Sequence, residues 1–174
     1  MGVNWIVAIW AFFEATFFFV VPDVLLTVIA VDGLKKALIA SLYALFGALI
    51  GGTLWYGLSL YYGEQGAFIL MDRMPRVMLE HAEQAKYNLE VYGFSSMMTS
   101  PWLDLPYKLY AVSAHSVEIP YWKFMLYSVP ARMTRFVILI FVTDMVMRVL
   151  NFFKIEVNRL FLVLFLWITF YAYF

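Results

Sequence analysis

Five ionisable residues lie inside apolar stretches of this sequence, where a charge is costly unless other groups compensate it. Glu14 and Asp23 lie on either side of a break in the first apolar stretch, and Lys108 follows a pair of prolines in a later one. Arg132 and Arg135 are three residues apart, so they share one face of a helix. Guanidinium and ammonium groups bind phosphate, whereas carboxylates hold such cations or take up a proton. These residue types indicate a charged cavity for an anion.

Prolines interrupt two of the apolar stretches, at Pro22 and at Pro101 and Pro106. Broken backbone at membrane depth persists only where protein or a water-filled cavity surrounds it. Paired interrupted segments indicate the binding site of a transporter, and the free amide donors of broken helices favour anions. We therefore expect residues 4–31 and 93–119 to form two re-entrant helical hairpins.

The composition is typical of an integral membrane protein. Of 174 residues, 64% are hydrophobic and 14% are charged, against roughly 25% charged residues in soluble domains. Twelve basic and twelve acidic residues cancel, which argues against a nucleic-acid partner. There is no cysteine, and His81 and His115 lack metal-ligand spacing, so we expect no cofactor. No catalytic set of residues can be assembled, and we expect no enzyme.

The remaining segments frame the hairpins in a single domain, residues 1–174. The uncharged residues 37–62 predict the clearest spanning helix, and their Gly-x-x-x-Gly motif allows close helix packing. Residues 64–92 are polar, with leucine and alanine at helical spacing, which indicates an amphipathic interfacial helix. Residues 121–150 and 157–174 predict two more spanning helices. The expected fold is an all-α, multi-pass membrane protein.

Four blocks of the chain form an ordered set that covers roughly residues 10–140. The blocks are Glu14-Ala-Thr-Phe-Phe-Phe-Val-Val-Pro22-Asp23-Val-Leu-Leu, Gly47-x-x-x-Gly51-Gly52 with Trp55-Tyr56-Gly57, Pro106-Tyr107-Lys108, and Ser128-Val-Pro-Ala-Arg132-Met-Thr-Arg135-Phe136. Together they resemble the signatures of the DedA family of membrane proteins, also called the VTT or SNARE-associated group. The YqaA-like branch is the most similar.

This resemblance implies two oppositely entering re-entrant hairpins that meet near the membrane centre, in a bacterial cytoplasmic membrane. It also implies lipid transport, as a scramblase or flippase whose partner is an anionic membrane lipid such as undecaprenyl phosphate or a phospholipid. Some relatives depend on the proton gradient. Carried over to this chain, Lys108, Arg132 and Arg135 would bind the head group, and Glu14 and Asp23 would act in proton coupling or gating.

Two other functions remain open. A proton- or cation-coupled carrier of a small solute would use Glu14 and Asp23 as its ion site. A non-transporting scaffold protein would use the helix with Gly47 and Gly51 as a docking face. The same glycine motif could support a homodimer or pack internally.

Each candidate residue also has a purely structural interpretation. The two arginines could pair with Glu14 or Asp144, and Asp104 could neutralise Lys108. Asp144 could equally pair with Arg148, which lies four residues further along the same helix.

Overall fold

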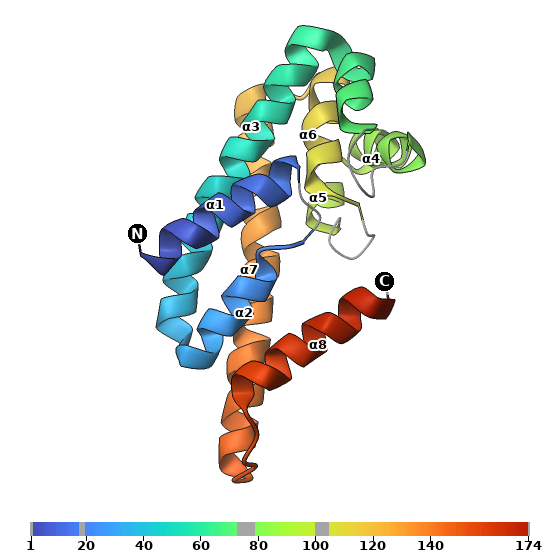
Figure 1. The fold of residues 1–174 in the computed structure, drawn as a ribbon. Helices are drawn as coiled ribbons and strands as arrows, with labels where there is room; N and C mark the ends of the chain where they lie inside the picture. Colours follow the sequence, from blue (N-terminus) through green and yellow to red (C-terminus); the bar gives the residue numbers. More distant parts are fainter. Residues whose placement is uncertain (1, 18–19, 73–78, 100–104, 174) are drawn as a thin grey trace.

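The computed structural model describes residues 2–17, 20–72, 79–99 and 105–173, and the elements in these ranges are all α-helices (Figure 1). The prediction of an all-α fold is confirmed for this part of the chain. The helices are α1 (Val3–Thr16), α2 (Asp23–Asp32), α3 (Leu34–Asp72), α4 (Leu79–Tyr92), α5 (Phe94–Thr99), α6 (Tyr107–Ser116), α7 (Tyr121–Phe152) and α8 (Arg159–Tyr173).

The first apolar stretch breaks where the sequence predicts it. The first helix, α1, ends at Thr16, and α2 begins directly after Pro22, whose φ of −65° suits the start of a helix. In Figure 1 the axes of α1 and α2 run in different directions. Residues 4–31 therefore form a broken helical unit, and its entry into a membrane as a re-entrant hairpin stays a prediction.

The longest helix, α3, contains the predicted spanning segment 37–62 and bends immediately after it. Gly63 has a φ of 74°, in the left-handed region that glycine adopts at low cost. The bend falls at the predicted boundary between segments 37–62 and 64–92. The second segment comprises the end of α3 and α4, and residues 73–78 between them lie outside the described part of the chain. An ion pair of 2.6 Å between Lys86 and Glu64 ties α4 to the bend.

The Gly-x-x-x-Gly motif of α3 packs inside the chain, against α1. A methyl group on Gly47 would lie 2.8 Å from the carbonyl carbon of Ala8. One on Gly51 would lie 2.6 Å from the Cβ atom of Ala15. Both alanines are buried, so the two helices approach closely through small residues. Of the two uses left open by the sequence, the structure shows internal packing for this motif.

We expect Gly47→Ala to lower the free energy of unfolding by about 1–3 kcal/mol, because the added methyl group overpacks the contact with α1. Gly57→Ala in the same helix is the matched control, since Gly57 is exposed and a methyl group there meets no atom within 4 Å. Alanine at that position should be neutral or stabilising by up to about 1 kcal/mol. Thermal unfolding in detergent compares the two variants. Equal melting temperatures would contradict the close approach of α1 and α3.

The second interrupted stretch forms α5 and α6. Residues 100–104 lie outside the described part of the chain, and with them the predicted break at Pro101 and the predicted pairing of Asp104 with Lys108. The helix α6 begins directly after Pro106 and is buried along most of its length, packed against α3 and α4. It therefore lies in the interior of the molecule (Figure 1).

Among the described residues, one helical segment, Leu34–Met71, is long and apolar enough to cross a membrane. The 32-residue helix α7 carries five charged residues, and the apolar helices α1 and α8 have 14 and 15 residues. A lone spanning helix needs about 20 apolar residues. Of the three predicted spanning helices, 37–62 thus has this support, whereas membrane crossing by 121–150 and 157–174 stays a prediction.

Candidate functional site

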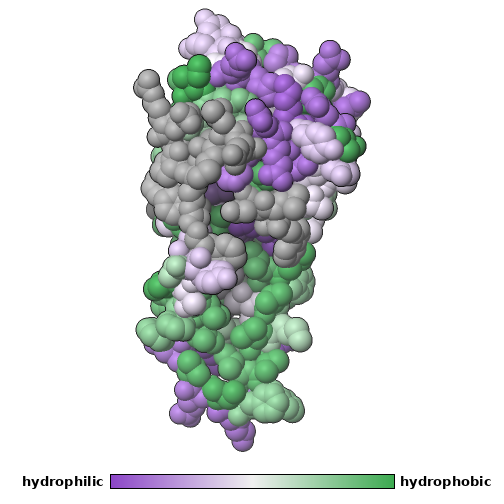
Figure 2. Space-filling model, turned by 90° about the vertical axis from the view of Figure 1, so that its right-hand side faces the viewer, coloured by the Kyte–Doolittle hydropathy of each residue, from purple (hydrophilic) through white to green (hydrophobic). Residues whose placement is uncertain are grey.

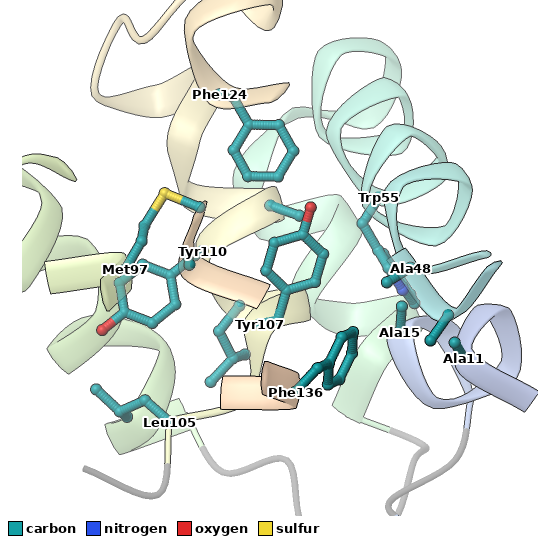
Figure 3. Packing of buried hydrophobic residues seen from close by; sticks show 14 of the residues in the cluster. Ala11, Ala15, Ala48, Trp55, Met97, Leu105, Tyr107, Tyr110, Phe124 and Phe136 are labelled. Atoms are coloured by element: carbon teal, nitrogen blue, oxygen red, sulfur yellow. The ribbon is translucent and has the colours of Figure 1, made fainter. Parts of the chain in front are cut away.

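Small and aromatic residues together build the centre of the molecule. Ala11 and Ala15 of α1 face α3, and the aromatic ring of Tyr107 lies between Phe124 and Phe136 of α7 (Figure 3). The small residues bring α1 close to the core, and the aromatic residues fill the space around α6. This packing brings the charged residues of α1, α2, α6 and α7 together.

Glu14 and Arg132 form a buried two-point ion pair between α1 and α7. The guanidinium Nη1 of Arg132 donates to Oε1 of Glu14 at 3.3 Å, and Nη2 donates to Oε2 at 3.0 Å. The side chains of Arg132 and Glu14 are only 6% and 12% exposed. Two parallel hydrogen bonds are also the geometry in which a guanidinium binds phosphate. The predicted pairing of an arginine with Glu14 is therefore confirmed.

A second ion pair joins Asp23 of α2 to Arg135 of α7. Asp23 is fully buried in the first turn of α2, where the helix dipole stabilises a carboxylate. The side chain of Arg135 is 24% exposed. Of the two arginines, Arg135 is thus the one that reaches the molecular surface.

Lys108 completes the group. It lies in the first turn of α6, is 4% exposed and interacts electrostatically with Glu14 and Arg132. Asp23 in turn interacts electrostatically with Glu14 and both arginines. The structure therefore brings all five predicted site residues together on four helices, and we call them the charged cluster. The charged cluster thus combines three basic and two acidic side chains.

Tyr107 was not predicted as a site residue, yet its ring supports Arg132. The Cζ atom of Arg132 lies 4.2 Å from the ring centroid, a cation–π distance. The Tyr107 hydroxyl donates to Oγ of Ser128 at 2.8 Å, and its ring stacks on Phe124. A methyl group on Gly52 would lie 2.9 Å from atoms of this ring, so the glycine leaves room for it. The signal that the sequence offered for Tyr107 was its position next to Lys108, inside an apolar stretch.

Two other charged or titratable residues lie apart from the charged cluster. Asp144 accepts a hydrogen bond of 2.7 Å from Nε of Arg148, so the predicted pairing four residues apart is confirmed. His115 lies at the end of α6, and its ring packs edge-on against Tyr56. The ion pair of Asp144 with Arg148 and the ring contact of His115 with Tyr56 both fit a structural role.

Fold and site together define an all-helical protein whose charged cluster lies beside a broken helix. No protein-family model matches the chain, and no solved structure matches it. The chain is similar to an uncharacterized protein of Haemophilus influenzae, with 23% identity over 128 residues. The match covers 74% of this chain and 65% of that relative, slightly less than two thirds of the relative's length. The likeness to the DedA family rests on the four sequence blocks and is carried forward as a proposal.

Proposed function

We propose that this protein is a DedA-type membrane lipid transporter or scramblase, which moves a phosphate-bearing lipid between leaflets by way of the charged cluster. The observation that carries the proposal is that three side chains able to bind phosphate, Lys108, Arg132 and Arg135, lie together with two carboxylates on four packed helices. A charge held out of water is costly unless a counter-charge compensates it. In this cluster the two carboxylates compensate the guanidinium groups, and an anionic head group could take their place.

The ion pairs suggest how a head group is bound and released. Arg132 donates hydrogen bonds to both carboxylate oxygens of Glu14, and a phosphate offers two oxygen acceptors in the same way. A phosphate can therefore replace the carboxylate without loss of hydrogen bonds. Protonation of Glu14 would weaken its hold on the guanidinium and favour this exchange. A phosphate could likewise replace Asp23 as the partner of Arg135, with which Asp23 forms an ion pair. The carboxylates then act in gating or proton coupling, and the three cations bind the lipid.

The surface of the molecule supports a membrane setting. Large apolar side chains are exposed along several helices, whereas soluble monomers rarely expose apolar patches of more than a few hundred Å². Figure 2 shows hydrophobic residues over the lower half of one face, between hydrophilic residues above and below. Exposed apolar residues of α7 and α8 include Phe141, Val142, Phe165, Leu166 and Ile168. Together with α3, this surface supports the proposal of a membrane protein, and the cytoplasmic membrane is implied by the family resemblance.

The scaffold alternative is weakened by the packing of α3. It places the docking face on the glycine motif, and α1 already occupies that face. The solute-carrier alternative uses the same acidic pair as the lipid model, so it is distinguished by the transported species.

Leaflet exchange in reconstituted vesicles tests the proposal. The protein is placed in neutral phosphatidylcholine vesicles that contain a fluorescent phospholipid or polyprenyl phosphate, and a membrane-impermeant quencher reports label from the inner leaflet. We expect the protein to accelerate exchange and Arg132→Lys with Arg135→Lys to slow it by about tenfold. Lysine keeps the charge but loses the two-point contact.

Arg148→Lys is the matched control, because this exposed arginine of α7 pairs away from the charged cluster. Its exchange rate should equal that of the wild type. Exchange at the protein-free rate with folded, inserted wild-type protein would contradict the lipid model. Proton-dependent solute uptake without lipid exchange would favour the solute carrier instead.

A further inference from the structure

One peptide group in the break between α1 and α2 is bound by aromatic side chains from two distant helices. The indole Nε1 of Trp10 donates to the carbonyl oxygen of Val20 at 2.9 Å. The N–H of Val21 donates to the hydroxyl oxygen of Tyr171 at 3.0 Å. This carbonyl and this N–H belong to the same peptide bond. The first helix and the last helix therefore hold one peptide from its two sides.

This peptide needs such partners because the break removes it from the hydrogen-bond ladder of either helix. A peptide group is planar, so binding both its oxygen and its N–H fixes its orientation as well as its position. The next residue, Pro22, has a φ fixed by its ring, and Asp23 follows directly. Few rotations thus separate the bound peptide from the carboxylate that pairs with Arg135.

The helix α8 reaches the break through one stripe of side chains four residues apart: Val163, Trp167 and Tyr171. Val163 is its buried residue, and Nε1 of Trp167 donates to Oγ1 of Thr27 in α2 at 2.8 Å. Trp167 and Tyr171 stack with their ring centroids 6.0 Å apart. Tyr171 also interacts electrostatically with Arg135. The last helix packs on α2, and its Tyr171 contacts the break that leads to Asp23.

We propose that Trp10 and Tyr171 are positioning residues of the transport site. By binding the two sides of the Val20–Val21 peptide, they hold Asp23 in line with Arg135. The inference rests on the proposed transport function and adds α8, which lies beyond the four sequence blocks, to the parts that build the site. Neither aromatic residue contacts the lipid in this mechanism.

Tyr171→Phe tests the inference, because it removes the hydroxyl and keeps the ring. We expect the maximal rate of leaflet exchange to fall by about three- to tenfold, the effect of one lost hydrogen bond. The half-saturating mole fraction of labelled lipid should change by less than about twofold, since Asp23 is not a ligand of the phosphate. Trp10→Phe removes the bond to the other side of the peptide and should act in the same way.

Trp167→Phe is the matched control, because it removes the other hydrogen bond between α8 and α2 and leaves the Val20–Val21 peptide bound. The exchange rate of Trp167→Phe should stay within about twofold of the wild type. Its melting temperature should be equal to or below that of Tyr171→Phe, so that a loss of stability does not explain the slower exchange of Tyr171→Phe. Equal exchange rates in Tyr171→Phe and Trp167→Phe would overturn the inference.

A second measurement is independent of lipid exchange. The chain has no cysteine, so a single Val21→Cys reports the mobility of the break through its rate of alkylation. Tyr171→Phe should raise this rate by about threefold or more, whereas Trp167→Phe should not. An unchanged alkylation rate would reject the positioning role, and absence of exchange by the wild type would reject the proposed function alone.

Discussion

Replacing Arg132 with methionine is expected to destabilise the protein by about 3–5 kcal/mol and to stop lipid exchange. The carboxylate of Glu14 would lose both of its hydrogen bonds to the guanidinium and remain as a charge that is only 12% exposed. Breaking a buried ion pair from one side has a cost of this size, because the carboxylate loses the partner that bound both of its oxygen atoms. Thermal and denaturant unfolding in detergent measure the loss of stability, and the vesicle assay measures exchange.

Combining Glu14→Leu with Arg132→Met separates a structural role of the pair from a transport role. Apolar residues of similar volume often replace a buried ion pair without loss of stability. The double variant should therefore recover part of the stability that Arg132→Met loses, although Lys108 also loses its interaction with Glu14, while exchange stays at the protein-free rate. Recovery of exchange together with stability would mean that the pair only holds α1 to α7.

The exposed pair of Asp144 and Arg148 provides the control for this experiment. Both residues lie on α7, and the side chain of Arg148 extends into the exterior of the molecule. Exposed pairs of this kind contribute less than about 1 kcal/mol. Arg148→Met should therefore change neither stability nor exchange appreciably.

The residues of the charged cluster were predictable because ionised groups are costly inside apolar sequence. Each of the five interrupts a stretch that is otherwise apolar, and burial of such groups implies partners nearby. The break before Asp23 was predictable for a similar reason, since Pro22 starts a helix far more easily than it continues one. Sequence therefore identified the charged groups and the places where the backbone must bend.

The pairing within the charged cluster was not predictable. Glu14 and Arg132 are far apart in the chain, and either carboxylate could have paired with either arginine, because the choice depends on how α1 and α2 pack on α7. The roles of Trp10 and Tyr171 were hidden for a different reason. The chain has 12 tyrosines and 6 tryptophans, so an aromatic residue that binds a backbone group does not stand out by type.

The bend between the spanning segment and the polar segment falls at the predicted boundary, but its backbone conformation was not predictable, because a glycine permits a bend without requiring one. Gly63 adopts a positive φ, whereas Gly57 lies in regular helix six residues earlier. The difference comes from the ion pair between Lys86 and Glu64 and from the packing of α4 on α6, which are contacts between distant residues. Local sequence does not contain that information.

Asp23→Asn is expected to lower lipid exchange by about a hundredfold, or ~2.7 kcal/mol in the barrier, with little loss of stability. Asparagine has nearly the same shape as aspartate, and a neutral amide is less costly than a carboxylate in a fully buried position. Arg135 would lose its partner but is 24% exposed, so water can solvate it. This contrasts with Arg132→Met, which leaves a charge that water scarcely reaches.

The effect on exchange follows from the gating role proposed for Asp23. A head group bound to Arg135 leaves when the carboxylate returns to the guanidinium, and asparagine cannot compete in this way because it has no charge. Asparagine also mimics a protonated aspartate, so any dependence of exchange on a pH gradient should fall to the part that Glu14 supplies. Asp32→Asn, at the exposed end of the same helix, is the control and should retain the wild-type rate. If Asp23→Asn exchanged lipid as fast as Asp32→Asn, the aspartate in the break would only hold Arg135 in place, and gating would have to depend on Glu14 alone.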